Sequence, residues 1–322
     1  MAFVIENDIN RRLIEPRDAI GIEALMDRWS VDVVEATVAG CGALNAAPNL
    51  LNKVRGAFGE ALLAGASERV RARMPCDWRP VCAAEVFFGR KPSITLGDHA
   101  SEIPKPFVLS CRRAGQDLIV RMTMFGFARD WGQAAALAFV DALRNRVRWF
   151  RLARDLSVFV PRRIEIRGLR SVTDVRAQVI EVPTALRLDF RAPVDAERGS
   201  VRDDPRTIFR RLIRRVALLA RWYDAALNFS ARHLDEVLSD FEIEFVDSDD
   251  YRLKTSHRRR GHHMMNAVID VPAIRLSGDL GELWPYLLIG ATAHVGRGAA
   301  VGLGQFDVTP LREQDVRLAL TG

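Results

Sequence analysis

Several kinds of residue are scarce in this chain, and each scarcity excludes a class of protein. Four cysteines in 322 residues are too few for a disulfide framework. The longest apolar runs, such as "LWPYLLIGA", fall short of the roughly 20 residues that cross a bilayer. The N-terminus has no apolar core followed by a cleavage site, so it does not read as a signal peptide. We therefore expect a cytoplasmic protein without a membrane partner.

The cysteines also argue against a metal centre. Cys76 and Cys82 form the one close pair, and the five residues between them exceed the usual two to four of a zinc site. We expect reduced or buried thiols, no metal and no other cofactor.

Lysine is nearly absent, although the chain is basic. The net charge is +6, and 43 of the 47 basic residues are arginine. A GC-rich genome would produce this bias without any functional cause. Equally, guanidinium groups bind phosphate through two hydrogen bonds and stack on bases, so arginine clusters are typical of nucleic-acid-binding proteins. Composition leaves both interpretations open.

Hydrophobic periodicity predicts two similar halves. The first half is expected to contain a strand over 31–40, a helix over 50–73, paired strands over 106–112 and 117–128, a helix over 130–150 capped by Asp130, and strand character over 156–172. The second half is expected to contain a strand over 184–194, a helix over 206–227, further strands, a short helix over 285–293 and a last strand over 303–311. This order predicts an α+β fold of two tandem ferredoxin-like domains, over residues 1–175 and 176–322.

The segment "HVGRGAAVGLG", residues 294–304, concentrates four glycines in one connection. Spaced glycines let backbone N–H groups approach an anion. The sequence excludes a P-loop and a dinucleotide fingerprint, because both lead from glycines into a helix and this segment leads into a strand. Taken as a motif alone, the segment predicts a packed turn more readily than a phosphate cradle.

In its wider context, "LGELWPYLLIGATAHVGRGAAVGLGQFDV" resembles the C-terminal glycine-rich signature of the RAMP superfamily, in particular that of the CRISPR repeat-processing endoribonucleases. The positions that match are His294, Val295, Gly296, Arg297, Gly298, Gly302, Leu303 and Gly304. Weaker similarities occur in chain order, including "VRGAFGEAL", "LRLDFRAPV" with "FRRLIRRVALL", and "CDWRPVCAAEVFFG", where the family often has spaced cysteines before an aromatic strand. The resemblance extends over roughly residues 50–310.

The resemblance implies two tandem ferredoxin-like, or RRM-like, domains and metal-independent cleavage of CRISPR precursor RNA within its repeats. A 2′-hydroxyl attacks the adjacent phosphate, leaving a 2′,3′-cyclic phosphate, and the protein then holds the repeat hairpin. The implied partners are CRISPR repeat RNA, both crRNA and its precursor, and other subunits of a CRISPR effector complex. The alternative is a non-catalytic RAMP subunit that binds RNA in such a complex.

The histidines depart from the family pattern. Many members place a catalytic histidine near the first helix, but the first histidine here is His99. The candidate catalytic residues are therefore His257 and His262 in "SHRRRGHH", together with His294. A solvated hairpin tip would explain "SHRRRGHH" equally, and His294 would equally serve to orient its loop. The candidate RNA-binding residues are Lys53, Arg55, Arg258, Arg259, Arg260, Gly296, Arg297, Gly298, Gly302 and Gly304.

Overall fold

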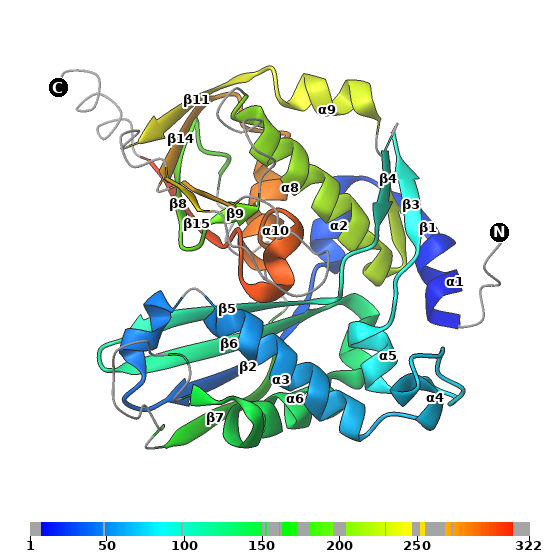
Figure 1. The fold of residues 1–322 in the computed structure, drawn as a ribbon. Helices are drawn as coiled ribbons and strands as arrows, with labels where there is room; N and C mark the ends of the chain where they lie inside the picture. Colours follow the sequence, from blue (N-terminus) through cyan, green and yellow to red (C-terminus); the bar gives the residue numbers. More distant parts are fainter. Residues whose placement is uncertain are drawn as a thin grey trace.

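The computed structural model describes residues 8–47, 49–97, 99–149, 152, 161, 163–172, 181–195, 204–228, 230–246, 252–254, 268–271 and 273–311. Two antiparallel four-stranded sheets lie one above the other, each with helices packed on it (Figure 1). The fold is therefore α+β, as predicted. Within the described part of the chain, no helix has the length and apolar character needed to span a bilayer.

The first unit has the ferredoxin-like order strand, helix, strand, strand, helix, strand. Its elements are β2 (Val31–Val38), η1 (Gly42–Ala46), α3 (Leu50–Ala64), β5 (Phe107–Ala114), β6 (Asp117–Phe125), η2 (Gly126–Trp131), α6 (Gly132–Asp141), η3 (Ala142–Arg146) and β7 (Ile164–Val172). The sheet order is β5-β6-β2-β7, so the first and third strands of the motif are central. Phe58 of α3 and Phe139 of α6 meet over this sheet, with ring centroids 6.3 Å apart, and form the centre of its core.

An excursion between α3 and β5 carries α4 (Glu68–Arg71), α5 (Ala83–Phe88), β3 (Ser93–Leu96) and β4 (His99–Glu102). The aromatic strand implied at "AAEVFFG" is wrong, because these residues form the helix α5. A helix places Val86 and Phe87 together in the core, where both are fully buried, whereas the alternation of a strand would send them to opposite faces.

The second unit repeats the same order. Its elements are β8 (Ala185–Phe190), α8 (Arg206–Leu219), α9 (Ala231–Val237), β11 (Phe241–Val246), β14 (Ala273–Gly278), α10 (Trp284–Ala293), η8 (Arg297–Val301) and β15 (Phe306–Pro310). The sheet order β11-β14-β8-β15 is again that of a ferredoxin-like domain. Burial alternates along the middle of β8, where Leu186 and Leu188 are buried and Arg187 between them is half-buried. A small sheet of β12 (Arg252–Lys254), β13 (Val268–Asp270) and β9 (Val194–Asp195) flanks the unit.

The first residues of the chain pack on the second unit. They form α1 (Asp8–Ile14), β1 (Asp18–Ile20) and α2 (Ile22–Arg28), and β1 pairs in parallel with β10 (Ala225–Leu227). The one-turn helix η6 (Ala220–Tyr223) lies between the units: the Trp222 indole donates to the Pro104 carbonyl at 2.9 Å, and Tyr223 stacks on Trp29 with centroids 4.6 Å apart. The two units are therefore joined through a shared aromatic cluster.

Three predicted helices differ from the observed ones. The helix expected over 50–73 ends at Ala64, where Gly65 caps it. The helix expected over 206–227 ends at Leu219, because Asp224 adopts a left-handed conformation and residues 225–227 pair with β1. The predicted N-cap Asp130 is wrong, since α6 follows directly on the one-turn helix η2 and its N-cap residue is Trp131. The boundary predicted at 175/176 falls outside the described residues.

Candidate nucleic-acid interface

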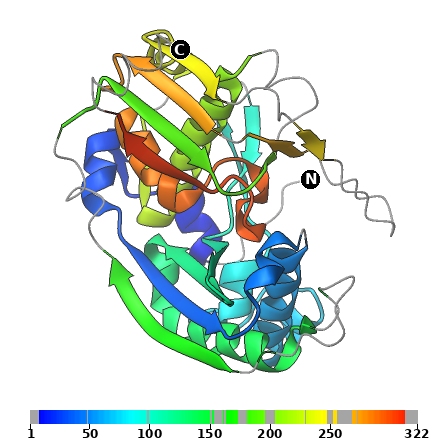
Figure 2. The ribbon, with the colours of Figure 1, turned by 90° about the vertical axis from the view of Figure 1, so that its left-hand side faces the viewer.

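The glycine segment begins where α10 ends. Figure 2 shows α10 and the segment that follows it above the first unit. His294 donates its backbone N–H to the Gly290 carbonyl at 2.7 Å and then turns the chain with φ 61°. Gly296, Gly302 and Gly304 follow with φ of 84°, 86° and 67°, a region that side-chain-bearing residues rarely occupy. The conformation of the segment therefore requires glycine at these three positions.

The same segment packs tightly on the first unit. A Cβ atom at Gly302 would overlap the Leu51 side chain of α3 and lie 3.2 Å from the Leu109 carbonyl of β5. The N–H groups of Gly302 and Gly304 donate to the Ala299 and Pro193 carbonyls at 2.9 and 2.8 Å, so both form hydrogen bonds within the protein. Gly296 and Gly298 are half-buried, while Gly302 and Gly304 are buried, so the packed part of the segment is its second half.

His294 lies inside the protein. Its residue is 3% exposed, and burial together with the neighbouring Arg215 guanidinium lowers the pKa of the imidazole to about 3. Arg215 on α8 is also buried and donates from Nε to the Ala293 carbonyl at 2.8 Å. Among the described residues, His294 Nδ1 and Arg215 Nη2 have no hydrogen-bond partner. A neutral imidazole in this position fits a residue that holds the start of the glycine segment.

Of the predicted basic residues of α3, Arg55 lies near two further lysines, the buried Lys91 and the half-buried Lys105. Lys53 is exposed, while Arg55 is half-buried and its guanidinium lies 5.1 Å from the centre of the Phe88 ring. Lys91 and Lys105 both donate from Nζ to the Gly89 carbonyl, at 3.2 and 2.6 Å. Burial and the Lys105 charge lower the pKa of Lys91 to about 7. Three of the four lysines of the chain thus occur within residues 53–105.

The face of the first sheet opposite α3 and α6 carries arginines that the sequence analysis did not single out. Arg121 of β6 contacts the buried Glu35 of β2 at 2.7 Å, and Arg167 of β7 lies 3.6 Å from the same carboxylate. Burial raises the pKa of Glu35, but Arg121, Arg112 and Arg167 outweigh this effect and lower it. One ionised carboxylate is thus surrounded by three arginines. The signal in the sequence was the alternation of arginine with apolar residues along these strands.

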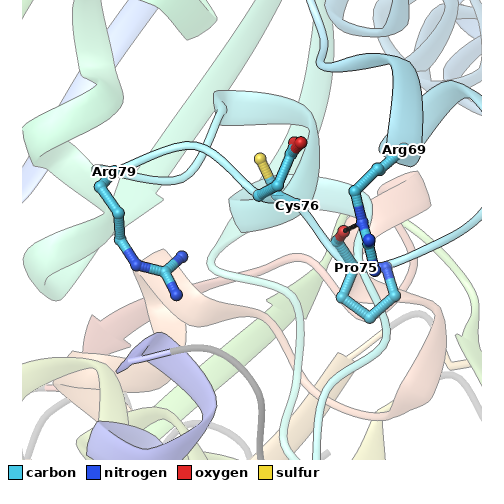
Figure 3. Close-up of a pocket in the computed structure, with 5 residues that line it drawn as sticks. Arg69, Pro75, Cys76 and Arg79 are labelled. Atoms are coloured by element: carbon cyan, nitrogen blue, oxygen red, sulfur yellow. Dashed lines mark hydrogen bonds between the residues drawn. The ribbon is translucent and has the colours of Figure 1, made fainter.

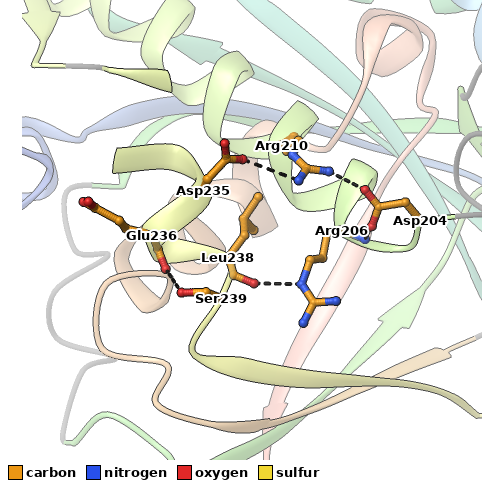
Figure 4. Close-up of polar contacts among 7 residues, drawn as sticks. All are labelled: Asp204, Arg206, Arg210, Asp235, Glu236, Leu238 and Ser239. Atoms are coloured by element: carbon orange, nitrogen blue, oxygen red, sulfur yellow. Dashed lines mark hydrogen bonds and ion pairs between the residues drawn. The ribbon is translucent and has the colours of Figure 1, made fainter. Parts of the chain in front are cut away.

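The arginines of α8 contact the protein itself. Arg206 donates to the Leu238 carbonyl at 2.8 Å, and Arg210 pairs with Asp204 and Asp235, as Figure 4 shows. Arg215 is also buried and donates to the Ala293 carbonyl, so several arginines of α8 bind other parts of the protein.

The histidine- and arginine-rich segment of 256–263 falls outside the described residues, and so do its candidates His257, His262, Arg258, Arg259 and Arg260. Strands β12 and β13, which lie before and after it in the chain, pair antiparallel, with Lys254 opposite Val268. For Arg297, the structure describes the backbone only. No group of three or more metal-ligating side chains occurs among the residues that the structure describes.

Comparison with known proteins is consistent with this architecture. A family model described as an N-terminal domain matches residues 42–165, and the model of CRISPR-associated endoribonuclease Cas6 matches residues 180–306. No curated protein matches the chain.

Solved structures with similar folds include three of interest. A Cas6 product complex has 16% identity and a TM-score of 0.47, and the match covers 87% of this chain and 99% of that one. Thermus thermophilus Cas6 has 14% identity and a TM-score of 0.44, covering 88% and 98%. A protein from a Cas6-related gene of Pyrococcus furiosus has 7% identity and a TM-score of 0.37, covering 88% and 99%.

The fold defines a protein of two tandem ferredoxin-like units that are joined at a glycine-rich connection. Residues 180–306, which contain that connection, match the model of the CRISPR-associated endoribonuclease Cas6 family.

Proposed function

We propose that this protein is a metal-independent endoribonuclease that cuts CRISPR precursor RNA within its repeats and then holds the repeat hairpin. One observation carries the proposal. The matched Cas6 segment contains the glycine connection, and this connection packs on α3 and β5 of the other unit. RNA bound at the connection would therefore contact both units at once.

In the proposed reaction, a base removes the proton of the 2′-hydroxyl next to the scissile phosphate. The oxygen attacks in line, a P–O bond to the 5′ oxygen breaks, and the products are a 2′,3′-cyclic phosphate and a 5′-hydroxyl. A histidine with a pKa near neutrality suits the base or acid role. His257 and His262 are our candidates for it. We assign His294 a positioning role, because an imidazole with a pKa of about 3 stays neutral at physiological pH and lies away from solvent.

Binding in this proposal relies on charge and on the first part of the glycine segment. Lys53 and Arg55 on α3, Arg258–Arg260 and Arg297 would contact phosphates, along with the backbone at Gly296 and Gly298. Gly302 and Gly304 would act indirectly, since their N–H groups donate within the protein. Each phosphate contact adds to the salt dependence of affinity, so replacing Lys53 with alanine should flatten the slope of log K against log salt by roughly one contact.

The test is to incubate the purified protein with a repeat-containing transcript in EDTA. We expect one discrete cut with a cyclic-phosphate end. His257→Ala and His262→Ala are expected to slow cleavage by about 100-fold or more while leaving RNA affinity unchanged, which is the scale of a lost general acid or base. His263→Ala is the matched control in the same segment. Cleavage at the wild-type rate by both variants would refute the assignment of the base.

The second candidate function is a non-catalytic RAMP subunit that binds repeat RNA within a CRISPR effector complex. Two observations favour it: no histidine precedes His99 in the chain, and His294 is buried. Tight binding with an intact transcript in the same assay, in both EDTA and magnesium, would support this function over the nuclease.

A further inference from the structure

Two cysteines of the first unit, Cys76 and Cys82, are in direct contact. They lie in the connection between α4 and α5, Cys82 as the N-cap residue of α5, and both residues are buried, at 4% and 6% exposure. The backbone N–H of Cys82 donates to Cys76 Sγ at 3.3 Å. This contact places the two cysteines next to each other.

The two thiols have opposite acidities. Burial raises the pKa of the Cys76 thiol, but hydrogen bonds from the Cys82 and Trp78 backbones and from the Ser67 side chain outweigh it and lower the pKa below its ordinary value. Burial and the neighbouring Cys76 raise the pKa of Cys82. Of the two sulfurs, Cys76 is therefore the one that loses its proton more readily, and Cys82 the one that retains it.

Cys76 also borders an opening. Arg69, Pro75, Cys76, Asp77 and Arg79 line a pocket of about 270 Å³, and Figure 3 shows the arginines of this group on either side of the cysteine. Arg69 is fixed there by a hydrogen bond from its Nε to the Pro75 carbonyl at 3.2 Å. A small uncharged oxidant such as hydrogen peroxide can enter a pocket of this volume.

We propose that Cys76 and Cys82 form a reversible peroxide-reactive dithiol, in which Cys76 is the attacking thiolate and Cys82 resolves the product to a disulfide. The cluster lies in the excursion between α3 and β5, apart from the glycine connection. The inference is therefore independent of the proposed nuclease function.

The chemistry needs one hydroperoxide per disulfide. The Cys76 thiolate attacks the peroxide, an S–O bond forms as the O–O bond breaks, and the departing oxygen takes up a proton. Cys76 becomes a sulfenic acid, oxidised by two electrons, and the hydroperoxide is reduced to water or an alcohol. Cys82 sulfur then attacks Cys76 sulfur, the S–O bond breaks, and the Cys82 proton leaves with the hydroxide as water. A thiol such as dithiothreitol reverses the reaction by disulfide exchange.

The chain offers its own reference cysteines. Cys41 is buried with a pKa raised by burial and by Asp117, and burial raises the pKa of Cys111 to about 11. Because a lower pKa gives a larger thiolate fraction, Cys76 should react faster than either.

The experiment treats the full-length protein with hydrogen peroxide, blocks remaining thiols and maps its peptides. Trypsin leaves both cysteines on the peptide of residues 74–90, since it does not cut the Arg79–Pro80 bond. We expect this peptide to lose the mass of two hydrogen atoms and to resist alkylation until dithiothreitol is added, while the peptides with Cys41 and Cys111 stay alkylatable. Cleavage before Asp77 should then yield two fragments that remain linked.

Two variants assign the roles. Cys82→Ser should stop at a sulfenic acid on Cys76 that dimedone traps, and Cys76→Ser should leave Cys82 unoxidised over the same period. The peptide mapping of the wild-type protein does not depend on these variants. It remains a valid test even if either variant fails to fold. Equal oxidation of all four cysteines, or a peptide of residues 74–90 that stays in the dithiol form after the others have reacted, would overturn the proposal.

Discussion

Replacing Gly302 with alanine tests whether the glycine connection is built by close packing. A Cβ at this position would overlap the Leu51 side chain, and the backbone has φ 86°. The left-handed conformation costs a side-chain-bearing residue about 1–2 kcal/mol, and overpacking adds about 1–3 kcal/mol, so we expect Gly302→Ala to lower the free energy of unfolding by about 2–5 kcal/mol.

A double-mutant cycle separates the two terms. Leu51→Ala removes the atoms that the new Cβ would meet, so the overlap disappears in the double variant while the backbone strain remains. We expect a favourable coupling of about 1–3 kcal/mol between the two substitutions. Urea unfolding followed by the fluorescence of the six tryptophans measures each variant.

The matched control is Gly56→Ala, on the same helix of the first unit as Leu51. Gly56 lies within α3, has open space around its Cα, and should gain about 1 kcal/mol from the better helix propensity of alanine. If Gly302→Ala unfolds at the wild-type urea concentration, or if the coupling with Leu51→Ala is zero, the close packing of the connection on α3 is refuted.

Three further substitutions test other parts of the structure. A Cβ at Gly126 would overlap the Trp222 carbonyl, so Gly126→Ala should cost at least about 3 kcal/mol in urea unfolding and make the segment between the units susceptible to limited proteolysis. The pKa of His294 is lowered to about 3, so between pH 6 and 4 the unfolded chain binds a proton at this histidine and the folded protein does not. The free energy of unfolding should therefore fall by about 1.4 kcal/mol for each pH unit as the pH drops from 6 to 4. In the His294→Asn variant, the slope of the free energy of unfolding against pH should be smaller by this amount. The pKa of Lys91 is lowered from 10.5 to about 7, so wild-type stability should rise from pH 7 to 10 relative to Lys91→Met, and parallel pH profiles would contradict the burial of Lys91.

The order of elements was predictable because it depends on local pattern. Strands β5 and β6 have polar turn residues between them, and α10 begins with Pro285 in its first turn, as expected. The ends of α3 and α8 were not predictable in the same way. The apolar pattern of α8 continues past Leu219, but residues 225–227 leave the helix to pair with β1, which lies more than 200 residues earlier. No local signal reports a partner at that separation.

The residues of the glycine segment could be identified from the sequence, but their burial and their neighbours could be predicted only in part. The sequence identified the glycine segment and its histidine, and the structure places three of its glycines at positive φ. The burial of His294 depends on Arg215 and on packing between α8 and α10, so no motif in residues 294–304 reveals it. The arginines around Glu35 come from the β5–β6 hairpin and from the later strand β7, and only pairing with β2 brings them onto one face.

The pairing of β1 with β10 has a consequence for synthesis on the ribosome. Residues 18–20 leave the ribosome first, yet their partners at 225–227 emerge only after the whole first unit has been made. The first unit, residues 31–172, has a complete sheet and core of its own and can fold in the meantime. The docking surface for Trp222, including Phe127 and the Pro104 carbonyl, then stays uncovered until η6 arrives. Pairing of the N-terminal strand therefore has to wait until residue 227 has been made, after the elements of the first unit.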